Sequence, residues 1–216
     1  MDYFISVLIP MLEGLVTTLK VFGITIVFSI PLGFCVTLLL RSQFKPLCYI
    51  AEFYVYLLRG TPLLLQLLFV YFGLPLIPVI GTALTFDRFT AACIAFGLNY
   101  AAYFAEIFRG GLLAIDPGQY EAAKVLGLTK AQTLFKVIIP QMIRVCLPSI
   151  SNETITLVKD TALVTIIGVS ETLHYAKAAV NRDANTFPFL VAAGVYLVII
   201  FFITLFFKHL EKRHRF

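Results

Sequence analysis

The sequence predicts an all-α integral membrane protein with about five transmembrane helices. Of the 216 residues, 60% are hydrophobic and 13% are charged, whereas a soluble domain carries roughly 25% charged residues. The basic residues gather beside long apolar runs, which is typical of membrane topology and does not indicate nucleic acid as a partner. A single transmembrane domain over residues 1–216 accounts for the length.

Five apolar segments are long enough to cross a bilayer whose hydrocarbon core is about 30 Å thick. We expect the spans at about 12–40, 47–72, 89–113, 131–158 and 187–207, and a re-entrant or short helical piece at about 168–180. The first ten residues carry no Lys or Arg and no cleavage pattern of a secretory signal, so we expect the first span to stay in the protein.

The second span is interrupted by Arg59 and by Gly60-Thr61-Pro62. Helix statistics favour a simple proline kink at this point. The alternative is a broken helix, which is tolerated at membrane depth only where it is buried in protein or lines a cavity.

Basic residues also predict the orientation of the chain. With the N-terminus outside, the inner segments hold Arg41, Lys45, Arg109, Lys124, Lys130, Lys136, Lys208, Lys212, Arg213 and Arg215, and the outer segments hold Arg88, Lys177 and Arg182. The positive-inside rule therefore favours an N-terminus out and a C-terminus in. This orientation places the charged segment 116–130 on the cytoplasmic side.

Segment 116–130 is expected to form a helix, a tight bend and a second helix. Pro117-Gly118 is a turn signal. In the helix that follows, Glu121 lies in the first turn, where a negative charge suits the helix dipole. Gly127 is a typical helix C-terminus, and Thr129 is a plausible N-cap for the next helix. An ordinary cytoplasmic loop is the alternative.

Polar side chains cluster inside the fourth span. Glu153, Thr156 and Asp160 are spaced i, i+3 and i+7 and share one helix face, while Asn152, Thr156 and Lys159 form an adjacent face. Charges in the hydrocarbon region cost several kcal/mol and usually face a bundle interior or a water-filled path. These residues could bind a zwitterion: the carboxylates would take an amino group or a basic side chain, and Lys159 or Asn152 would take a carboxylate.

The alternative for this segment is structural: Lys159 and Asp160 would mark the outer membrane border, and Glu153 would bond to a neighbouring helix. A second candidate site lies in the third span. Asn99, Tyr103 and Glu106 are spaced i, i+4 and i+7 on one face. Glu106 and Arg109 could instead form a structural ion pair near the cytoplasmic border.

Catalytic and metal-binding motifs are absent from the sequence. It contains no G-x-x-x-x-G-K-[ST] phosphate loop, no G-x-S-x-G and no H-E-x-x-H. The cysteines and histidines show no metal-ligand or disulfide spacing. We therefore expect no catalytic residue, no metal and no cofactor in this chain, and we do not expect it to hydrolyse ATP by itself.

Two stretches resemble the permeases of binding-protein-dependent ABC importers. Glu121-Ala122-Ala123, Gly127 and Val137-x-Ile139-Pro140 are similar to the EAA loop of that family, with Val137 in place of Ile and Ile139 in place of Leu. Arg59-Gly60-Thr61-Pro62-Leu-Leu-Leu-Gln66 resembles the branch that transports polar amino acids such as histidine, glutamate, glutamine, arginine and opines.

The resemblance implies a type I ABC importer permease in the cell (inner) membrane of a bacterium or archaeon. It also implies partners: two ATP-binding subunits that hold ATP and Mg, a second permease chain, identical or homologous, and an extracytoplasmic substrate-binding protein. In the family the EAA loop docks into a groove on the ATPase, so the expected coupling residues are Glu121, Ala122, Ala123 and Gly127. The surplus of carboxylates over cations in the polar segments favours a basic amino acid as substrate.

The main rival is an ion-coupled secondary transporter in which Glu106, Glu153 and Asp160 bind protons or sodium. Such a transporter needs no ATPase, but it usually has more spans or an internal repeat. The sequence shows neither. A purely structural membrane subunit is a third reading, and it would leave Glu153 and Asp160 without a purpose.

Overall fold

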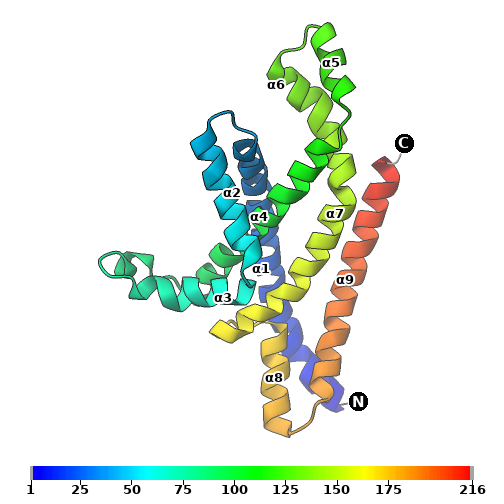
Figure 1. Ribbon diagram of the computed structural model, residues 1–216. Helices are drawn as coiled ribbons and strands as arrows, with labels where there is room; N and C mark the ends of the chain where they lie inside the picture. Colours follow the sequence, from blue (N-terminus) through cyan, green and yellow to red (C-terminus); the bar gives the residue numbers. More distant parts are fainter. Residues whose placement is uncertain (1, 215–216) are drawn as a thin grey trace.

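The computed structural model describes residues 2–214, and every regular element in that range is helical (Figure 1). The α-helices are α1 (Asp2–Leu40), α2 (Lys45–Gly60), α3 (Leu63–Leu68), α4 (Arg88–Leu113), α5 (Pro117–Val125), α6 (Lys130–Gln132), α7 (Ile139–Asp160), α8 (Thr172–Asp183) and α9 (Phe187–His214). The short 3-10 and π elements are η1 (Phe69–Gly73), η2 (Leu74–Leu76), η3 (Gly81–Leu84), η4 (Thr133–Ile138) and η5 (Thr161–Ile167). Arg215, which we assigned to the inner side, lies outside the described residues.

The prediction of about five spans is confirmed. In the described part of the chain, four helices are long and apolar enough to cross a membrane: Asp2–Leu40, Arg88–Leu113, Lys130–Ile167 and Phe187–Arg213. A bent pair, Lys45–Gly60 with Leu63–Leu76, makes a fifth when its two helices are counted as one broken span. The fourth span is longer than the predicted 131–158 because η5 continues it to Ile167. The piece expected near 168–180 is the helix α8.

The two ends of the described chain lie at opposite ends of the bundle. In Figure 1 the N-terminus and α8 are at the bottom, whereas α5, α6 and the C-terminal end of α9 are at the top. An odd number of spans requires this arrangement. It agrees with the orientation that the basic residues predict.

The first helix begins ten residues earlier than the predicted span, so our start near residue 12 was wrong. Val7 and Met11 are buried against Ala176 of α8 and Ala192 of α9. A proline inside a helix removes one backbone hydrogen bond, yet α1 runs through Pro10. The packing of its first turns against α8 and α9, which are distant in sequence, compensates for that loss.

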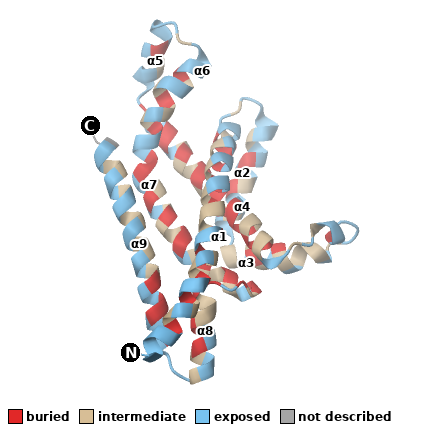
Figure 2. Cartoon of the chain, turned by 180° about the vertical axis from the view of Figure 1, so that it is seen from behind, coloured by how far each residue is buried: buried red, intermediate tan, exposed pale blue. Residues whose placement is uncertain are grey.

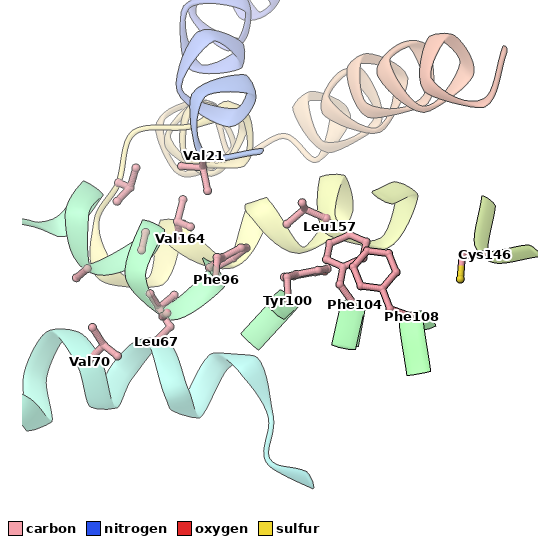
Figure 3. Close-up of a cluster of buried hydrophobic side chains, with 14 of the residues drawn as sticks. Val21, Leu67, Val70, Phe96, Tyr100, Phe104, Phe108, Cys146, Leu157 and Val164 are labelled. Atoms are coloured by element: carbon pink, nitrogen blue, oxygen red, sulfur yellow. The ribbon is translucent and has the colours of Figure 1, made fainter. Parts of the chain in front are cut away.

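The hydrophobic core is built around α4, which packs against α1, α2 and α7. Phe96, Tyr100 and Phe104 of α4 are fully buried in a cluster with Leu67 and Leu157 (Figure 3). Buried positions lie on the inward faces of the helices, and much of α9 is exposed (Figure 2). These exposed faces are largely apolar, as expected for helices in contact with lipid.

Asp87 caps the N-terminus of α4 by accepting hydrogen bonds from the backbone amides of Phe89 (3.0 Å) and Thr90 (3.1 Å). The hydrogen bonds from Thr90, first from its side chain and then from its amide, lower the pKa of the Asp87 carboxyl. The cap therefore stays charged at neutral pH and suits the positive end of the helix dipole.

Helices α1 and α4 approach each other closely at Gly33. A Cβ added at Gly33 would lie 2.8 Å from the carbonyl oxygen of Ala101 and 2.8 Å from the Cβ of Phe104. Beside it, the Thr37 hydroxyl donates to the carbonyl of Ala105 at 3.0 Å. Small residues that let backbones approach, joined by a hydroxyl hydrogen bond, are typical of helix pairs in membranes.

Replacing Gly33 by alanine is expected to destabilise the chain by about 1–3 kcal/mol, because the backbone of α4 would have to move. Gly23 lies on the same helix, and a Cβ there would meet nothing within 4 Å. Gly23→Ala is therefore the matched control and should leave stability unchanged or slightly raised. Thermal unfolding of the two purified variants in one detergent checks this. Equal melting temperatures would contradict the close contact.

The second span is broken, so the simple proline kink that statistics favoured was wrong. The axes of Lys45–Gly60 and Leu63–Leu76 differ by 104°. The Gln66 side-chain amide donates to the carbonyl of Leu58 (2.8 Å) and to the carbonyl (3.1 Å) and hydroxyl (2.8 Å) of Thr61. Asn99 of α4 also donates to the Leu58 carbonyl, at 3.0 Å. The break is stable because side chains satisfy the backbone groups that it frees.

Candidate functional site

A pocket of about 540 Å³ lies where the broken second span meets α4 and α7. We call it the polar pocket. Its lining is Arg59, Gly60, Thr61, Pro62, Leu63, Leu64, Asn99, Tyr100, Tyr103, Glu153, Thr156, Asp160 and Leu163. The second span is therefore a broken helix that lines a cavity, which was the alternative to a proline kink.

The structure brings most of the two predicted clusters of the third and fourth spans together, and Glu106 of the third span is not among the lining residues. Asn99 and Tyr103 of α4 and Glu153, Thr156 and Asp160 of α7 line the same pocket. Helix periodicity placed each group on one face of its own helix. The packing of α4 against α7 joins those faces.

Asn152 and Lys159 do not line the polar pocket, although we expected them to take a substrate carboxylate. Both residues are exposed. They belong to the face of α7 adjacent to that of Glu153 and Asp160, and of this adjacent face it is Thr156 that lines the pocket. The cation that does line the pocket is Arg59 of α2.

The wall of the pocket on α7 is acidic. The Tyr100 hydroxyl of α4 donates a 2.8 Å hydrogen bond to Asp160. Glu153 and Asp160 of α7 line the same pocket as Arg59 of α2. The Thr156 hydroxyl donates to the backbone carbonyl of Asn152 at 3.1 Å, so its oxygen remains able to accept. This wall can receive a cationic group.

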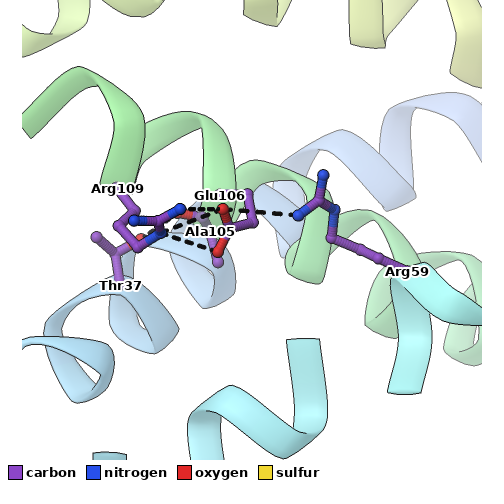
Figure 4. Close-up of polar contacts among 5 residues, drawn as sticks. All are labelled: Thr37, Arg59, Ala105, Glu106 and Arg109. Carbon is purple, nitrogen blue, oxygen red and sulfur yellow. Dashed lines mark hydrogen bonds and ion pairs between the residues drawn. The ribbon is translucent and has the colours of Figure 1, made fainter. Parts of the chain in front are cut away.

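Arg59 lines the pocket and belongs to an ion-pair network with Glu106 and Arg109 of α4, which do not line it (Figure 4). Arg59 lies over the ring of Tyr103, with 5.3 Å between the guanidinium carbon and the ring centroid. One Arg59 nitrogen is 3.6 Å from a carboxylate oxygen of Glu106. Glu106 also pairs with Arg109 at 2.7 Å, which is the structural pair we considered.

Asn99 is 3% exposed, and its side-chain nitrogen donates at 3.0 Å both to the Leu58 carbonyl and to the Gln66 side-chain oxygen. Both amide hydrogens are thus used inside the protein. Asn99 therefore holds the break in the second span against α4. Its contribution to the polar pocket is first of all to fix the shape of the wall.

Segment 116–130 forms the expected helix, bend and helix. Asp116 accepts from the Gly118 amide at 2.6 Å and caps α5. After α5, Gly127 has φ +73°, and its amide donates to the carbonyl of Lys124 at 3.0 Å. The next amide, of Leu128, donates to the carbonyl of Ala123 at 3.0 Å, which completes a Schellman motif.

The helix that follows begins as predicted. Thr129 accepts from the backbone amide of Gln132 at 3.2 Å, while the Gln132 side chain accepts from the Thr129 amide at 2.9 Å. This reciprocal capping box fixes where α6 starts. The bend between α5 and α6 is therefore defined by hydrogen bonds on both sides.

Ala122 and Ala123 are both expected coupling residues, but they differ in exposure. Ala123 is 2% exposed because α5 packs on η4. Ala122 is exposed, as are Glu121 and the apolar pair Val125 (87%) and Leu126 (77%). The surface offered to another protein is therefore the outer side of α5 and its apolar C-terminal end.

The sequence reading missed Glu171, the N-cap residue of α8. Its side chain is fully buried and accepts hydrogen bonds from Thr165, the His174 amide (2.8 Å) and Tyr196 (2.7 Å). Glutamate is not a preferred N-cap, and its donors come from three different elements. The one feature of the sequence that could have pointed to Glu171 is that a carboxylate lies there between two apolar spans.

Residues 2–214 contain no group of three or more histidine, cysteine, aspartate or glutamate side chains placed to hold a metal ion. The carboxylates of the polar pocket share it with Arg59, and Asp160 accepts a hydrogen bond from the Tyr100 hydroxyl. This arrangement suits a ligand that carries both positive and negative groups.

Comparison with known proteins shows close relatives along nearly the whole chain. It is 40% identical over 203 residues to the arginine transport system permease protein ArtQ of Bacillus subtilis (strain 168), covering 94% of this chain and 91% of that protein. It is 37% identical over 207 residues to the L-cystine transport system permease protein TcyB of the same organism, covering 94% and 86%. A putative glutamine transport system permease protein of Rickettsia conorii is 35% identical over 202 residues, covering 93% and 91%.

Solved structures show the same fold. The crystal structure of an amino acid ABC transporter with histidines contains a chain that is 35% identical and superposes with a TM-score of 0.85, covering 94% of each chain. An inward-facing methionine ABC transporter, at 18% identity, shares the fold with a TM-score of 0.74. The expected fold of a type I ABC importer permease is thereby confirmed. Residues 7–216 match the model of the binding-protein-dependent transport system inner membrane component, and the chain therefore belongs to this family of transport permeases.

Proposed function

We propose that this chain is the membrane-spanning subunit of an ATP-driven importer for polar amino acids, and that the substrate crosses through the polar pocket. The observation that carries the proposal is the pocket itself, in which Glu153 and Asp160 face Arg59 between candidate membrane spans. Relatives named for arginine, glutamine and cystine transport support an amino acid as substrate.

The charge of the pocket favours a basic amino acid. Two carboxylates and one arginine line it, which leaves a surplus of one negative charge. The surplus is negative, so a substrate with two positive groups and one carboxylate would balance it better than a neutral zwitterion. A charge that is desolvated between helices is stabilised only by such pairing.

The chain itself carries no phosphate loop, so the proposal assigns ATP and Mg to two partner ATPase subunits. The contact with them would be the outer side of α5, with Glu121, Ala122 and the apolar end at Val125 and Leu126. The Gln141 side chain of α7 donates to Gln119 of α5 at 3.0 Å, so α5 is fixed to a transmembrane helix. A movement of the ATPases could therefore be transmitted to the spans.

The rest of the assembly follows from the same proposal. A second permease chain, identical or homologous, would complete the translocation path, and an extracytoplasmic binding protein would deliver the amino acid. The transporter would reside in the inner membrane as a multi-pass protein. Ala123 and Gly127 would act within this chain, Ala123 by packing α5 on η4 and Gly127 by forming the bend.

Glu153→Gln and Asp160→Asn are each expected to lower the rate of amino-acid uptake at least about tenfold, since each removes one charged hydrogen-bonding partner worth about 1.5–3 kcal/mol. Both substitutions keep the size of the side chain, so the chain should still assemble with its ATPase. Glu13→Gln, at an exposed glutamate of α1, is the matched control and should transport normally. The measurement is uptake of a panel of labelled amino acids by right-side-out membrane vesicles, with ATP inside and the binding protein outside. Wild-type uptake by both pocket variants would move the substrate path elsewhere.

A further inference from the structure

Arg59 is the one cation among the described residues that line the polar pocket. It stands in the last turn of α2, immediately before the break. Its side chain is 41% exposed. The guanidinium is therefore held near the pocket by the broken helix without being sealed inside the protein.

The position of Arg59 depends on two neighbours on α4. The Tyr103 ring lies under the guanidinium, at 5.3 Å from carbon to centroid, which is within the range of a cation–π contact. The Glu106 carboxylate lies 3.6 Å from one Arg59 nitrogen. This distance gives an ion pair but is too long for a hydrogen bond.

Glu106 gives its hydrogen bonds to Arg109 instead. Arg109 donates from two nitrogens, at 2.7 Å and 3.0 Å, in a bidentate pair. Figure 4 shows Glu106 between the two arginines, with Arg109 on one side and Arg59 on the other. Glu106 is thus fixed by Arg109 while it attracts Arg59, and the hydrogen-bond donors of Arg59 remain available to a ligand.

From this geometry we propose that Arg59 binds the α-carboxylate of the amino acid in the polar pocket, and that Glu106, fixed by Arg109, is the residue that positions Arg59. This inference rests on the proposed function and specifies how the substrate is oriented. The carboxylate faces α2, and the cationic groups face Glu153 and Asp160 on α7. A planar guanidinium matches a carboxylate by two parallel hydrogen bonds, which a lysine could not provide.

The orientation can be tested by removing the carboxylate from the ligand. The membrane complex of permease and ATPase chains is purified without the binding protein, so that bound ligand reports on the membrane-spanning chains. The probes are the amino acid that the wild-type complex binds most tightly, selected from the twenty, and the amine made by its decarboxylation. Wild type should prefer the amino acid at least about tenfold.

Arg59→Gln should abolish this preference, because the amino acid loses affinity while the amine does not. Arg182→Gln is the matched control: Arg182 also pairs with a carboxylate, that of Asp183, but at the exposed end of α8. This control should keep the wild-type preference. An Arg59→Gln complex with undiminished preference would overturn the role of Arg59.

Glu106→Gln should reduce the preference several-fold, and Glu106→Asp should restore part of it. A merely structural role of Glu106 would weaken the binding of amino acid and amine equally, and an increased preference would mean that Glu106 competes with the ligand. Either result overturns the positioning role. If wild type binds none of the twenty amino acids, the proposed function fails and this inference fails with it. If wild type binds an amino acid but the Arg59 and Glu106 variants do not change the preference as expected, this inference fails and the proposed function stands.

Discussion

Replacing Gly127 by valine is expected to abolish ATP-driven uptake, while the chain still inserts in the membrane and keeps its helices. Gly127 has φ +73°, a conformation that costs a non-glycine residue about 1–3 kcal/mol and is least accessible to a β-branched one. A Cβ at this position would meet nothing within 4 Å. The cost is therefore conformational, and it falls on the Schellman motif that ends α5.

The effect of Gly127→Val is measured by the rate of uptake and by co-purification of the ATPase chain. Asparagine tolerates the left-handed region, so Gly127→Asn should retain most of the uptake. Gly110→Ala is a second control, because a Cβ at Gly110 also meets open space and its φ is ordinary. Normal coupled uptake by Gly127→Val would show that the bend does not transmit the action of the ATPase.

Replacing Glu171 by alanine is expected to give the largest loss of stability, about 3 kcal/mol or more, because several buried donors would lose their acceptor at once. The carboxylate is fully buried. It accepts from Tyr196 of α9 at 2.7 Å, from the His174 amide at 2.8 Å, from Thr165 of η5 and, more weakly at 3.5 Å, from Thr18 of α1. Removing it would loosen four elements at the N-terminal end of the bundle.

Thermal unfolding in detergent, followed by the loss of the monodisperse peak in size-exclusion chromatography, reports this effect. Glu171→Gln keeps the shape and one acceptor oxygen, so its melting temperature should lie between those of wild type and Glu171→Ala. Glu13→Ala removes an exposed glutamate of α1 and serves as the control. If Glu171→Ala has the same melting temperature as wild type, the carboxylate does not hold these helices together.

The sequence predicts the helices well where the signal is local. Apolar runs located the spans, and i, i+3, i+7 spacing placed Glu153, Thr156 and Asp160 on one face, where the structure has them lining one pocket. The glycine and threonine at 127 and 129 predicted the bend between α5 and α6, because capping depends on neighbouring residues.

Errors arose where a contact joins distant parts of the chain. Two polar faces of α7 overlap at Thr156, and their spacing cannot tell which one lines the polar pocket. Lys159 was expected there, whereas the cation in the lining is Arg59. The break in the second span depends on Asn99, which is 41 residues from Leu58 in sequence. The early start of α1 depends on α8 and α9 in the same way.

We propose that this chain moves an amino acid through the polar pocket with energy from ATP. The most direct test is uptake by liposomes that contain the purified permease and ATPase chains, with the binding protein outside and ATP inside. We predict uptake that requires ATP, resists dissipation of ion gradients and is lost in the Glu153→Gln, Asp160→Asn double variant. Uptake by the permease chain alone, driven by an ion gradient without ATP, would contradict the account and establish a secondary transporter.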